Sequence, residues 1–191
     1  MDTKDVITVI NTPHNDLLYS RIINYIDNYP YLKKAGIMTG DVSNPTVIDP
    51  SVRNVNSMNF IDNEFISAKI FTKLIDHEIS KYYINYSSKF PHCNVQKIQE
   101  MQGLKYEVGG KYEVHTDSFQ EYHRELTCII NLNDGYEGGD FVFYNPNGKE
   151  IIKEVKTQKG QMIFFPSNHL FPHAVTPITK GVRYSLVLWL A

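Results

Sequence analysis

The chain is poor in cysteine. Its 191 residues include two, Cys93 and Cys128, which lie far apart and form no Cys-x-x-Cys pair. This spacing argues against a disulfide framework and against a thiolate zinc site. We therefore expect reduced thiols and a cytoplasmic location. The first residues, Met-Asp-Thr-Lys-Asp, also lack the basic start and apolar core of a secretory signal, so no processing is expected.

Long apolar runs and a strong charge of one sign are lacking too. No run approaches the roughly 18 apolar residues that a membrane span needs. The net charge of −2 gives no overall basic excess, so neither a membrane nor a nucleic acid is expected as a partner. Hydrophobic residues make up 42% of the chain, enough for the core of a single domain covering 1–191. The oligomeric state cannot be predicted from these features.

Two helices are predicted in the first half of the chain. Apolar residues recur at three-to-four spacing over 17–26 and again from residue 65 to the tyrosine pair at 82–83. Asp62 or Asn63 is predicted to cap the second helix through its side chain. Residues 6–10 are predicted to form a strand before the first helix.

The segment 29–57 separates these helices and is rich in Pro, Gly and polar residues. It predicts a long irregular connection with short strands, and loops of this length are often functional lids. We expect it to help clamp a substrate. Isolated histidines in polar or helical stretches are more often surface residues than ligands, and we interpret four in this way: His14, His77, His92 and His123.

From residue 98 onward the pattern changes to short β-like runs separated by Gly, Asn and Pro. Their regular spacing predicts a double-stranded β-helix, a jelly-roll or cupin-like core over about 96–191. Helical support over about 1–95 would make the chain α+β and mainly β. The eight predicted strands are 98–106, 112–116, 126–132, 140–144, 151–155, 161–165, 173–177 and 183–190.

A candidate metal site lies in the second of these strands. Residues two apart on a strand share a face, so His115 and Asp117 would present an imidazole and a carboxylate side by side. One more histidine would complete a two-His, one-carboxylate face with open positions, which suits non-haem Fe(II). His173 and His169 both lie near the start of a later strand, and spacing alone leaves either as the third ligand.

Arg183 opens the last predicted strand, on the face shared with Ser185, Val187 and Trp189. An arginine that points into an apolar barrel needs an anion, and its planar guanidinium pairs bidentately with a carboxylate. An acidic co-substrate between the metal and Arg183 would satisfy this requirement. The alternative is an ordinary strand-end arginine paired with Asp or Glu.

These elements occur in an order that resembles a known family. Tyr106-x-x-Gly-Gly-x-Tyr112-x-x-His115-x-Asp117 is similar to the metal-binding strand of the 2-oxoglutarate- and Fe(II)-dependent dioxygenases, in their prolyl 4-hydroxylase-like branch. The resemblance covers roughly the last half of the chain. Its other elements are Leu132-Asn133, Gly138-Gly139-Asp140, Phe143, the run 160–166, His173, Val175, Pro177, Gly181, Arg183 and Trp189, and more weakly Arg53 with Ser57.

The resemblance implies roles for individual residues. His115, Asp117 and His173 would bind Fe(II), and Arg183 would bind the distal carboxylate of the co-substrate 2-oxoglutarate. Tyr106 or Tyr112 would assist the co-substrate, and ascorbate would serve as a reductant. A substrate pocket is implied near three further residues: Arg53, Asn131 and Trp189.

The activity implied by the resemblance is hydroxylation of prolyl residues in a protein or peptide by O2, with succinate and CO2 as co-products. Two alternatives are hydroxylation of a free amino acid or other small molecule, and an iron-free jelly-roll binding module. Nucleic-acid demethylation is disfavoured, because those relatives carry a second arginine where Trp189 stands. Arg183 matches the oxygen-sensing and bacterial enzymes, whereas collagen-type enzymes use lysine there. Asn131 departs from a tyrosine of the oxygen-sensing relatives, which leaves its role open.

Overall fold

The computed structural model describes residues 2–13, 15–39, 41, 43, 45–118 and 124–191. His14 and His123, both predicted to be surface residues, lie outside the described residues. The N-terminal half contains three helices, α1 (Thr3–Val6), α2 (Asp16–Asp27) and α3 (Ile66–Lys89). Its strands are β1 (Thr8–Asn11), β2 (Lys33–Lys34), β3 (Ile37–Met38), β4 (Thr46–Val47), β5 (Arg53–Asn54) and β6 (Asn56–Asn59).

The C-terminal half is built from strands, as its short apolar runs predict. Each of the eight predicted strands is present, and two short strands join them. The full set is β7 (Ile98–Tyr106), β8 (Lys111–His115), β9 (Leu126–Asn131), β10 (Glu137–Gly138), β11 (Phe141–Tyr144), β12 (Ile151–Val155), β13 (Gln161–Pro166), β14 (His173–Val175), β15 (Ile178–Lys180) and β16 (Arg183–Leu190).

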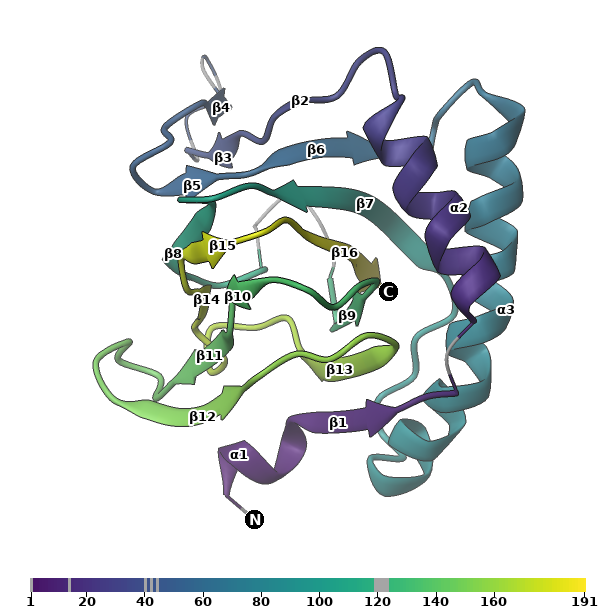
Figure 1. Cartoon of the computed structure of the whole chain (residues 1–191). Helices are drawn as coiled ribbons and strands as arrows, with labels where there is room; N and C mark the ends of the chain where they lie inside the picture. The colour runs from purple at the N-terminus through teal and green to yellow at the C-terminus, as the bar shows by residue number, and fades with distance from the viewer. Residues whose placement is uncertain (1, 14, 40, 42, 44, 119–123) are drawn as a thin grey trace.

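The larger strands form two antiparallel sheets that face each other (Figure 1). The seven-stranded sheet has the order β1-β13-β9-β16-β7-β6-β2, and the five-stranded sheet has the order β12-β11-β14-β8-β5. This double-sheet arrangement, in a chain of mixed helices and mainly strands, confirms the predicted jelly-roll class. The N-terminal half supplies strands to both sheets as well as helices, because β1, β2 and β6 extend the larger sheet and β5 the smaller one.

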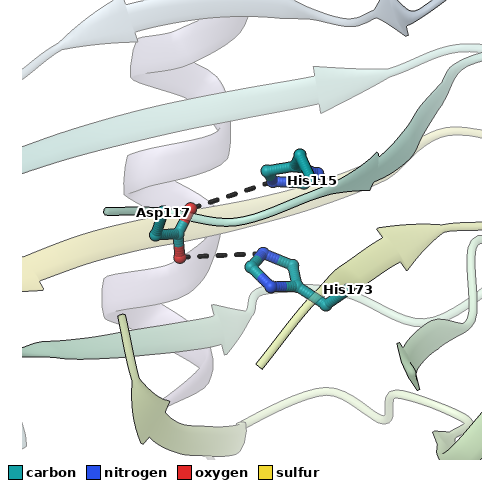
Figure 2. A group of neighbouring side chains, drawn as sticks. All are labelled: His115, Asp117 and His173. Carbon is teal, nitrogen blue, oxygen red and sulfur yellow. Dashed lines mark ion pairs between the residues drawn. The ribbon is translucent and has the colours of Figure 1, made fainter. Parts of the chain in front are cut away.

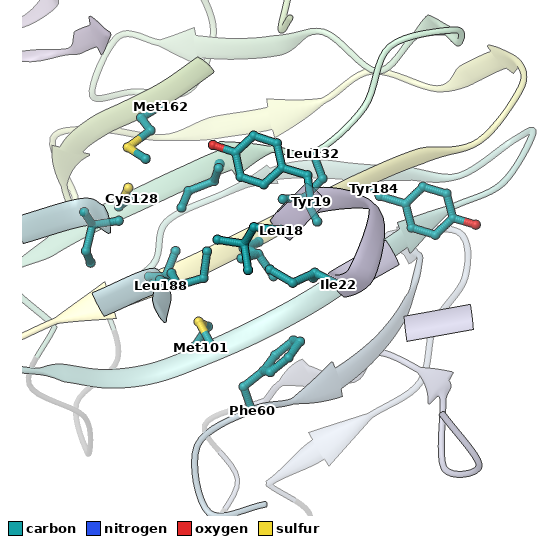
Figure 3. Close-up of a cluster of buried hydrophobic side chains, with 14 of the residues drawn as sticks. Leu18, Tyr19, Ile22, Phe60, Met101, Cys128, Leu132, Met162, Tyr184 and Leu188 are labelled. Carbon is teal, nitrogen blue, oxygen red and sulfur yellow. The ribbon is translucent and has the colours of Figure 1, made fainter. Parts of the chain in front are cut away.

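The alternation of β16 divides the core into two layers. Leu186 and Leu188 belong to the layer under helices α2 and α3, whose apolar residues include Ile22 and Ile75. Figure 3 shows Leu188 and Ile22 in this layer. Val187 and Trp189 point between the sheets, and Arg183 shares their alternation. The helices therefore cover one face of the large sheet, while the other face encloses the space where the candidate site lies.

The start of α3 differs from the prediction. The cap is Phe65, which makes no side-chain capping bond, so the prediction that Asp62 or Asn63 caps this helix is wrong. The Asn63 amide instead donates to the Asn59 carbonyl at 2.7 Å and to the Tyr29 hydroxyl at 3.0 Å, which fixes the turn before the helix. At its other end the helix passes the tyrosine pair and ends at Lys89. Among the described residues, no helix combines the length and apolar character that crossing a bilayer requires.

Candidate metal centre

Strands β8 and β14 bring two candidate ligands, His115 and His173, together. They pair antiparallel, and His173 lies directly opposite His115 in their register. Asp117 follows two residues after His115, just beyond the end of β8, and turns its carboxylate toward both imidazoles (Figure 2). The structure thus brings together three side chains that span 58 positions of the sequence, from His115 to His173.

The geometry of this group suits a single metal ion. His115 Nε2 lies 3.8 Å from one Asp117 carboxylate oxygen, and His173 Nε2 lies 3.6 Å from the other. The ligand atoms of all three residues lie within 4.8 Å of one another. Asp117 and His173 are buried, and His115 is partly exposed. Two imidazoles and one carboxylate leave further positions open on an octahedral ion, which is the donor set of non-haem Fe(II) sites.

Backbone carbonyls orient both imidazoles. The Nδ1–H of His115 donates to the Glu113 carbonyl at 2.8 Å, and the Nδ1–H of His173 donates to the Phe171 carbonyl at 3.0 Å. A carbonyl only accepts, so each ring carries its proton on Nδ1 and presents the Nε2 lone pair to the group. Burial and the adjacent His173 lower the pKa of His115 to about 3, which keeps that imidazole neutral at neutral pH.

The Asp117 carboxylate is held by hydroxyl groups. The Thr127 hydroxyl donates to Asp117 Oδ2 at 2.7 Å and lies 2.8 Å from the Ser167 hydroxyl. Burial raises the pKa of Asp117, but the positive charge that the two imidazoles carry when protonated and the Thr127 hydrogen bond lower it below its usual value, so the carboxylate is ionised at neutral pH. Both residues are buried: Thr127 lies in β9, and Ser167 directly follows β13. They fix the rotation of the carboxylate that faces the imidazoles.

Replacing Thr127 by valine is therefore expected to raise the Fe(II) dissociation constant by about 10- to 100-fold, the usual effect of losing a partner of a ligand. Valine keeps the shape and removes only the hydroxyl. Anaerobic Fe(II) titration measures the effect without relying on activity. Thr127→Ser should restore binding, and Thr72→Val, which removes a hydroxyl bonded within α3, should leave it unchanged. Equal affinity for wild type and Thr127→Val would show that the hydroxyl does not position Asp117.

Arg183 supplies a second unusual feature. It is 1% exposed, and its Nε and Nη2 atoms have no hydrogen-bond partner among the described residues. Its Nη1 donates a long hydrogen bond of 3.3 Å to the Ser185 hydroxyl. Ion pairing to Asp or Glu, the alternative interpretation of this residue, is not found in the described part of the chain. A buried guanidinium with unpaired donors is costly unless an anion binds it, so the structure fits a bound carboxylate here.

Neighbouring residues shape the space around the guanidinium. Tyr106 lies opposite Arg183 in the β7–β16 register, and the guanidinium carbon is 5.3 Å from the centre of its ring. Burial raises the pKa of Tyr106, so its hydroxyl remains a neutral donor. Gly139 has φ of +69°, and a Cβ there would lie 2.9 Å from Cδ of Arg183. The second glycine of the Gly138-Gly139 pair is thus favoured by its positive φ and by the side chains of Ile178 and Arg183, both of which a Cβ would meet.

A cavity of about 640 Å³ opens beside the metal group. Tyr106 lines it, together with three other residues predicted near the site, Tyr112, Arg53 and Trp189. Tyr112 stacks on His115 with ring centres 3.5 Å apart, and the Arg53 guanidinium lies 4.6 Å from the Tyr112 ring. The ring of Tyr112 thus packs between the imidazole of His115 and the guanidinium of Arg53 and restricts the movement of that imidazole.

Two predicted candidates lie elsewhere. His169, the competitor for the third ligand, is exposed and takes no part in the group of three. Asn131 is fully buried and does not line the cavity. Its amide donates to the Asn133 carbonyl at 2.7 Å and accepts from the Tyr136 hydroxyl at 3.1 Å, so it stabilises the turn after β9. Both ends of the amide are engaged in that turn, and a role for Asn131 in substrate binding stays a prediction.

Several site residues were not predicted from the sequence. Thr127 lies in an otherwise apolar run, and a hydroxyl buried in such a strand was the available signal. Arg124 and Glu100 gave no such signal. The Arg124 guanidinium donates to Glu100 at 2.6 Å and to the Asp117 carbonyl at 3.0 Å, and it lies 3.9 Å from the Trp189 ring. Only the fold brings these three contacts to the wall of the cavity.

Comparisons with known proteins found similar sequences in one superfamily. Residues 101–191 match the model of the 2OG-Fe(II) oxygenase superfamily. Human prolyl 3-hydroxylase 2 is 36% identical over 66 residues, which are 35% of this chain and 9% of that protein. A PKHD-type hydroxylase of Synechococcus sp. (strain CC9605) is 33% identical over 100 residues, covering 50% of this chain and 43% of that one. The chain thus spans less than half the length of these relatives.

Solved structures share the fold over nearly the whole chain. A Trichoplax adhaerens prolyl hydroxylase, solved with a peptide fragment of the hypoxia inducible factor oxygen degradation domain, has a TM-score of 0.72 at 16% identity and covers 96% of this chain and 82% of its own. A Pseudomonas putida prolyl-4-hydroxylase has a TM-score of 0.70 at 17% identity, covering 96% and 91%. At these identities the solved structures show a shared fold. The match of residues 101–191 to the 2OG-Fe(II) oxygenase superfamily is what agrees with the resemblance seen in the sequence.

Proposed function

We propose, from the match of residues 101–191 to the 2OG-Fe(II) oxygenase superfamily, that this chain is a dioxygenase that hydroxylates prolyl residues in a protein or peptide. The observation that carries the proposal is Arg183. It is a buried guanidinium with two nitrogens that lack partners among the described residues, and it shares the face of β16 on which Val187 and Trp189 point between the sheets. A metal that needs a dicarboxylate co-substrate would account for both the group of three metal-binding side chains and the guanidinium of Arg183.

The residues fit the group that the family implies. His115, Asp117 and His173 would hold Fe(II) through one face, and Arg183 would bind the distal carboxylate of 2-oxoglutarate. Iron with 2-oxoglutarate and O2 supplies the oxidising power for C–H hydroxylation, with succinate and CO2 as co-products. Ascorbate as a reductant stays a prediction.

The protein's part is to bind, orient and exclude water. Arg183 fixes one end of the co-substrate by a charge-assisted pair, and Tyr106 offers a neutral hydroxyl beside it. Phe141 stacks on His173 at 5.1 Å, and Phe165 meets the same ring edge-on at 4.8 Å. This aromatic wall keeps water from the buried side of the site, so a substrate must approach through the cavity.

The shape of the cavity supports a peptide over a free amino acid. It extends from the metal group to residues of the 29–57 segment, including Tyr31, Lys33 and Met38. A single amino acid would fill only a small part of about 640 Å³. The 29–57 segment would clamp the peptide along this length. We include in the proposal a single domain over 1–191, and a cytoplasmic location supported by Cys93 and Cys128, which are both free thiols.

The test is anaerobic reconstitution with Fe(II) and 2-oxoglutarate, then addition of O2 with a panel of proline-containing peptides. The expected result is one added oxygen by mass on a prolyl residue, together with succinate in equal amount. Reactions without 2-oxoglutarate or without O2 are the controls. Hydroxylation of a free amino acid with all peptides untouched would contradict the peptide assignment. Failure of the protein to bind 2-oxoglutarate with metal would contradict the enzyme and favour an iron-free binding module.

A further inference from the structure

The part of the cavity that the 29–57 segment forms is lined by aromatic and basic residues. The turn after α2 contributes Tyr29 and Tyr31 to this lining, and β2 contributes Lys33 and Lys34. The rings of Tyr29 and Tyr31 meet edge-on at 5.9 Å, and Tyr31 is 67% exposed. Both lysines are exposed. The metal chemistry uses none of these residues, so their role concerns whatever enters the cavity.

The charges of the lining are unbalanced. Among the described lining residues, four are basic, namely Lys33, Lys34, Arg53 and Arg124, and two are acidic, Glu100 and Asp117. Arg124 is paired with Glu100 at 2.6 Å, and Asp117 belongs to the metal group. The remaining three cations face the cavity of a chain whose net charge is −2.

The contacts of these three cations leave their charge uncompensated. Lys34 Nζ donates to the Asn54 side-chain oxygen at 2.8 Å, and Arg53 donates to the Gly36 carbonyl at 2.8 Å and to Gln102 at 3.2 Å. All of these acceptors are neutral. Arg53 is 8% exposed, and its Nε has no hydrogen-bond partner among the described residues. No ion pair to Lys33 is found in the described part of the chain. The part of the cavity lined by Lys33, Lys34 and Arg53 therefore favours a negatively charged occupant.

We propose that the substrate of this site is an acidic peptide, in which carboxylates beside the target residue pair with Lys33 and Lys34 while the chain passes over Tyr31. This inference rests on the proposed function and names its substrate class. Tyrosine rings offer a flat surface for proline rings and peptide bonds, and basic side chains beside them select acidic neighbours. An acidic peptide also gains from the positive field of the cavity before contact, so its association depends on salt.

The experiment compares two peptides that each have one central proline. In one the flanking residues are aspartates, and in the other they are asparagines. Fluorescence anisotropy under anaerobic conditions, with Fe(II) and 2-oxoglutarate present, measures binding without turnover. The wild type is expected to bind the aspartate peptide about tenfold more tightly at low salt, with the advantage shrinking as salt screens exposed ion pairs.

The double variant Lys33→Glu with Lys34→Glu should remove or reverse this preference. The matched control is Lys69→Glu with Lys73→Glu on α3, which changes the net charge equally at two exposed lysines that do not line the cavity. The control should keep the preference of the wild type. Because all four side chains are exposed, thermal unfolding of the two double variants is expected to be similar, and Lys33→Gln with Lys34→Gln provides a milder change in the same place.

Equal affinity of the wild type for the two peptides would overturn the inference. So would a preference that survives in the variants of Lys33 and Lys34. Selective binding of the aspartate peptide without any oxygen transfer to it would support the acidic substrate while contradicting hydroxylation of this proline. Equal hydroxylation of both peptides, with equal affinity, would contradict the acidic substrate and leave the proposed hydroxylase in place.

Discussion

Arg183→Ala is expected to raise the dissociation constant of 2-oxoglutarate by at least about 100-fold, because a buried charge-assisted bidentate pair is lost. Metal affinity should change little, since Arg183 contacts none of the three candidate ligands in the structure. Anaerobic calorimetry with Fe(II) present measures the first quantity, and Fe(II) titration alone measures the second. The two measurements separate a co-substrate role from a general loss of structure.

Arg183→Lys is the informative companion variant. Lysine keeps the positive charge but loses the planar fork, so an intermediate loss of about tenfold is expected. Unfolding without 2-oxoglutarate provides a further check. The wild type carries two unpaired guanidinium nitrogens in its core, so Arg183→Ala should not lose more than a small part of its stability. Unchanged 2-oxoglutarate affinity in both variants would remove the main support for the co-substrate.

Asp117→Ala is expected to weaken Fe(II) binding by at least about 1,000-fold, because the anionic ligand of the site is lost. Asp117 is also the one residue of the group that contacts both imidazoles, at 3.8 and 3.6 Å. Hydroxylation should be lost with the metal. Fe(II) titration followed by mass measurement of product tests both statements on the same sample.

Two variants control this prediction. Glu137→Ala removes an exposed carboxylate that pairs with Lys180 on the surface, and it should leave Fe(II) affinity unchanged. Asp117→Glu keeps the charge but displaces the oxygens by one methylene, so it should bind Fe(II) more weakly than the wild type and more tightly than Asp117→Ala. Fe(II) bound by Asp117→Ala as tightly as by the wild type would place the metal elsewhere.

The strands and the ligand group differ in how far they could be predicted. Alternation predicted that His115 and Asp117 share a face, and the strand 183–190 has the predicted bounds. The choice between His173 and His169 could not be made from spacing, because it depends on which residue pairs opposite His115 across β8 and β14. That pairing is a non-local contact, which local pattern does not encode.

Predictions that relied on a residue's usual role were less reliable. Asn63 has a side chain suited to capping, but the helix begins two residues later: its oxygen accepts from the backbone N–H of the cap residue Phe65 at 3.0 Å, while its amide nitrogen donates to Tyr29 and Asn59. The amide of Asn131 is likewise engaged locally, by Tyr136 and Asn133. In both cases hydrogen bonds made within a turn engage the polar side chain.

By itself, the sequence determined the mainly β class, the strands of the C-terminal half and the chemical nature of the candidate ligands, because side-chain alternation and residue type are local properties. Only the tertiary structure placed His173 beside His115 and Asp117, gave Asp117 its bond from Thr127, and buried Arg183 with two nitrogens that lack partners among the described residues. It also placed Lys33 and Lys34 on the same cavity as the metal group. These facts depend on strand pairing and sheet packing between distant residues, and burial and charge pairing exist only after the chain has folded.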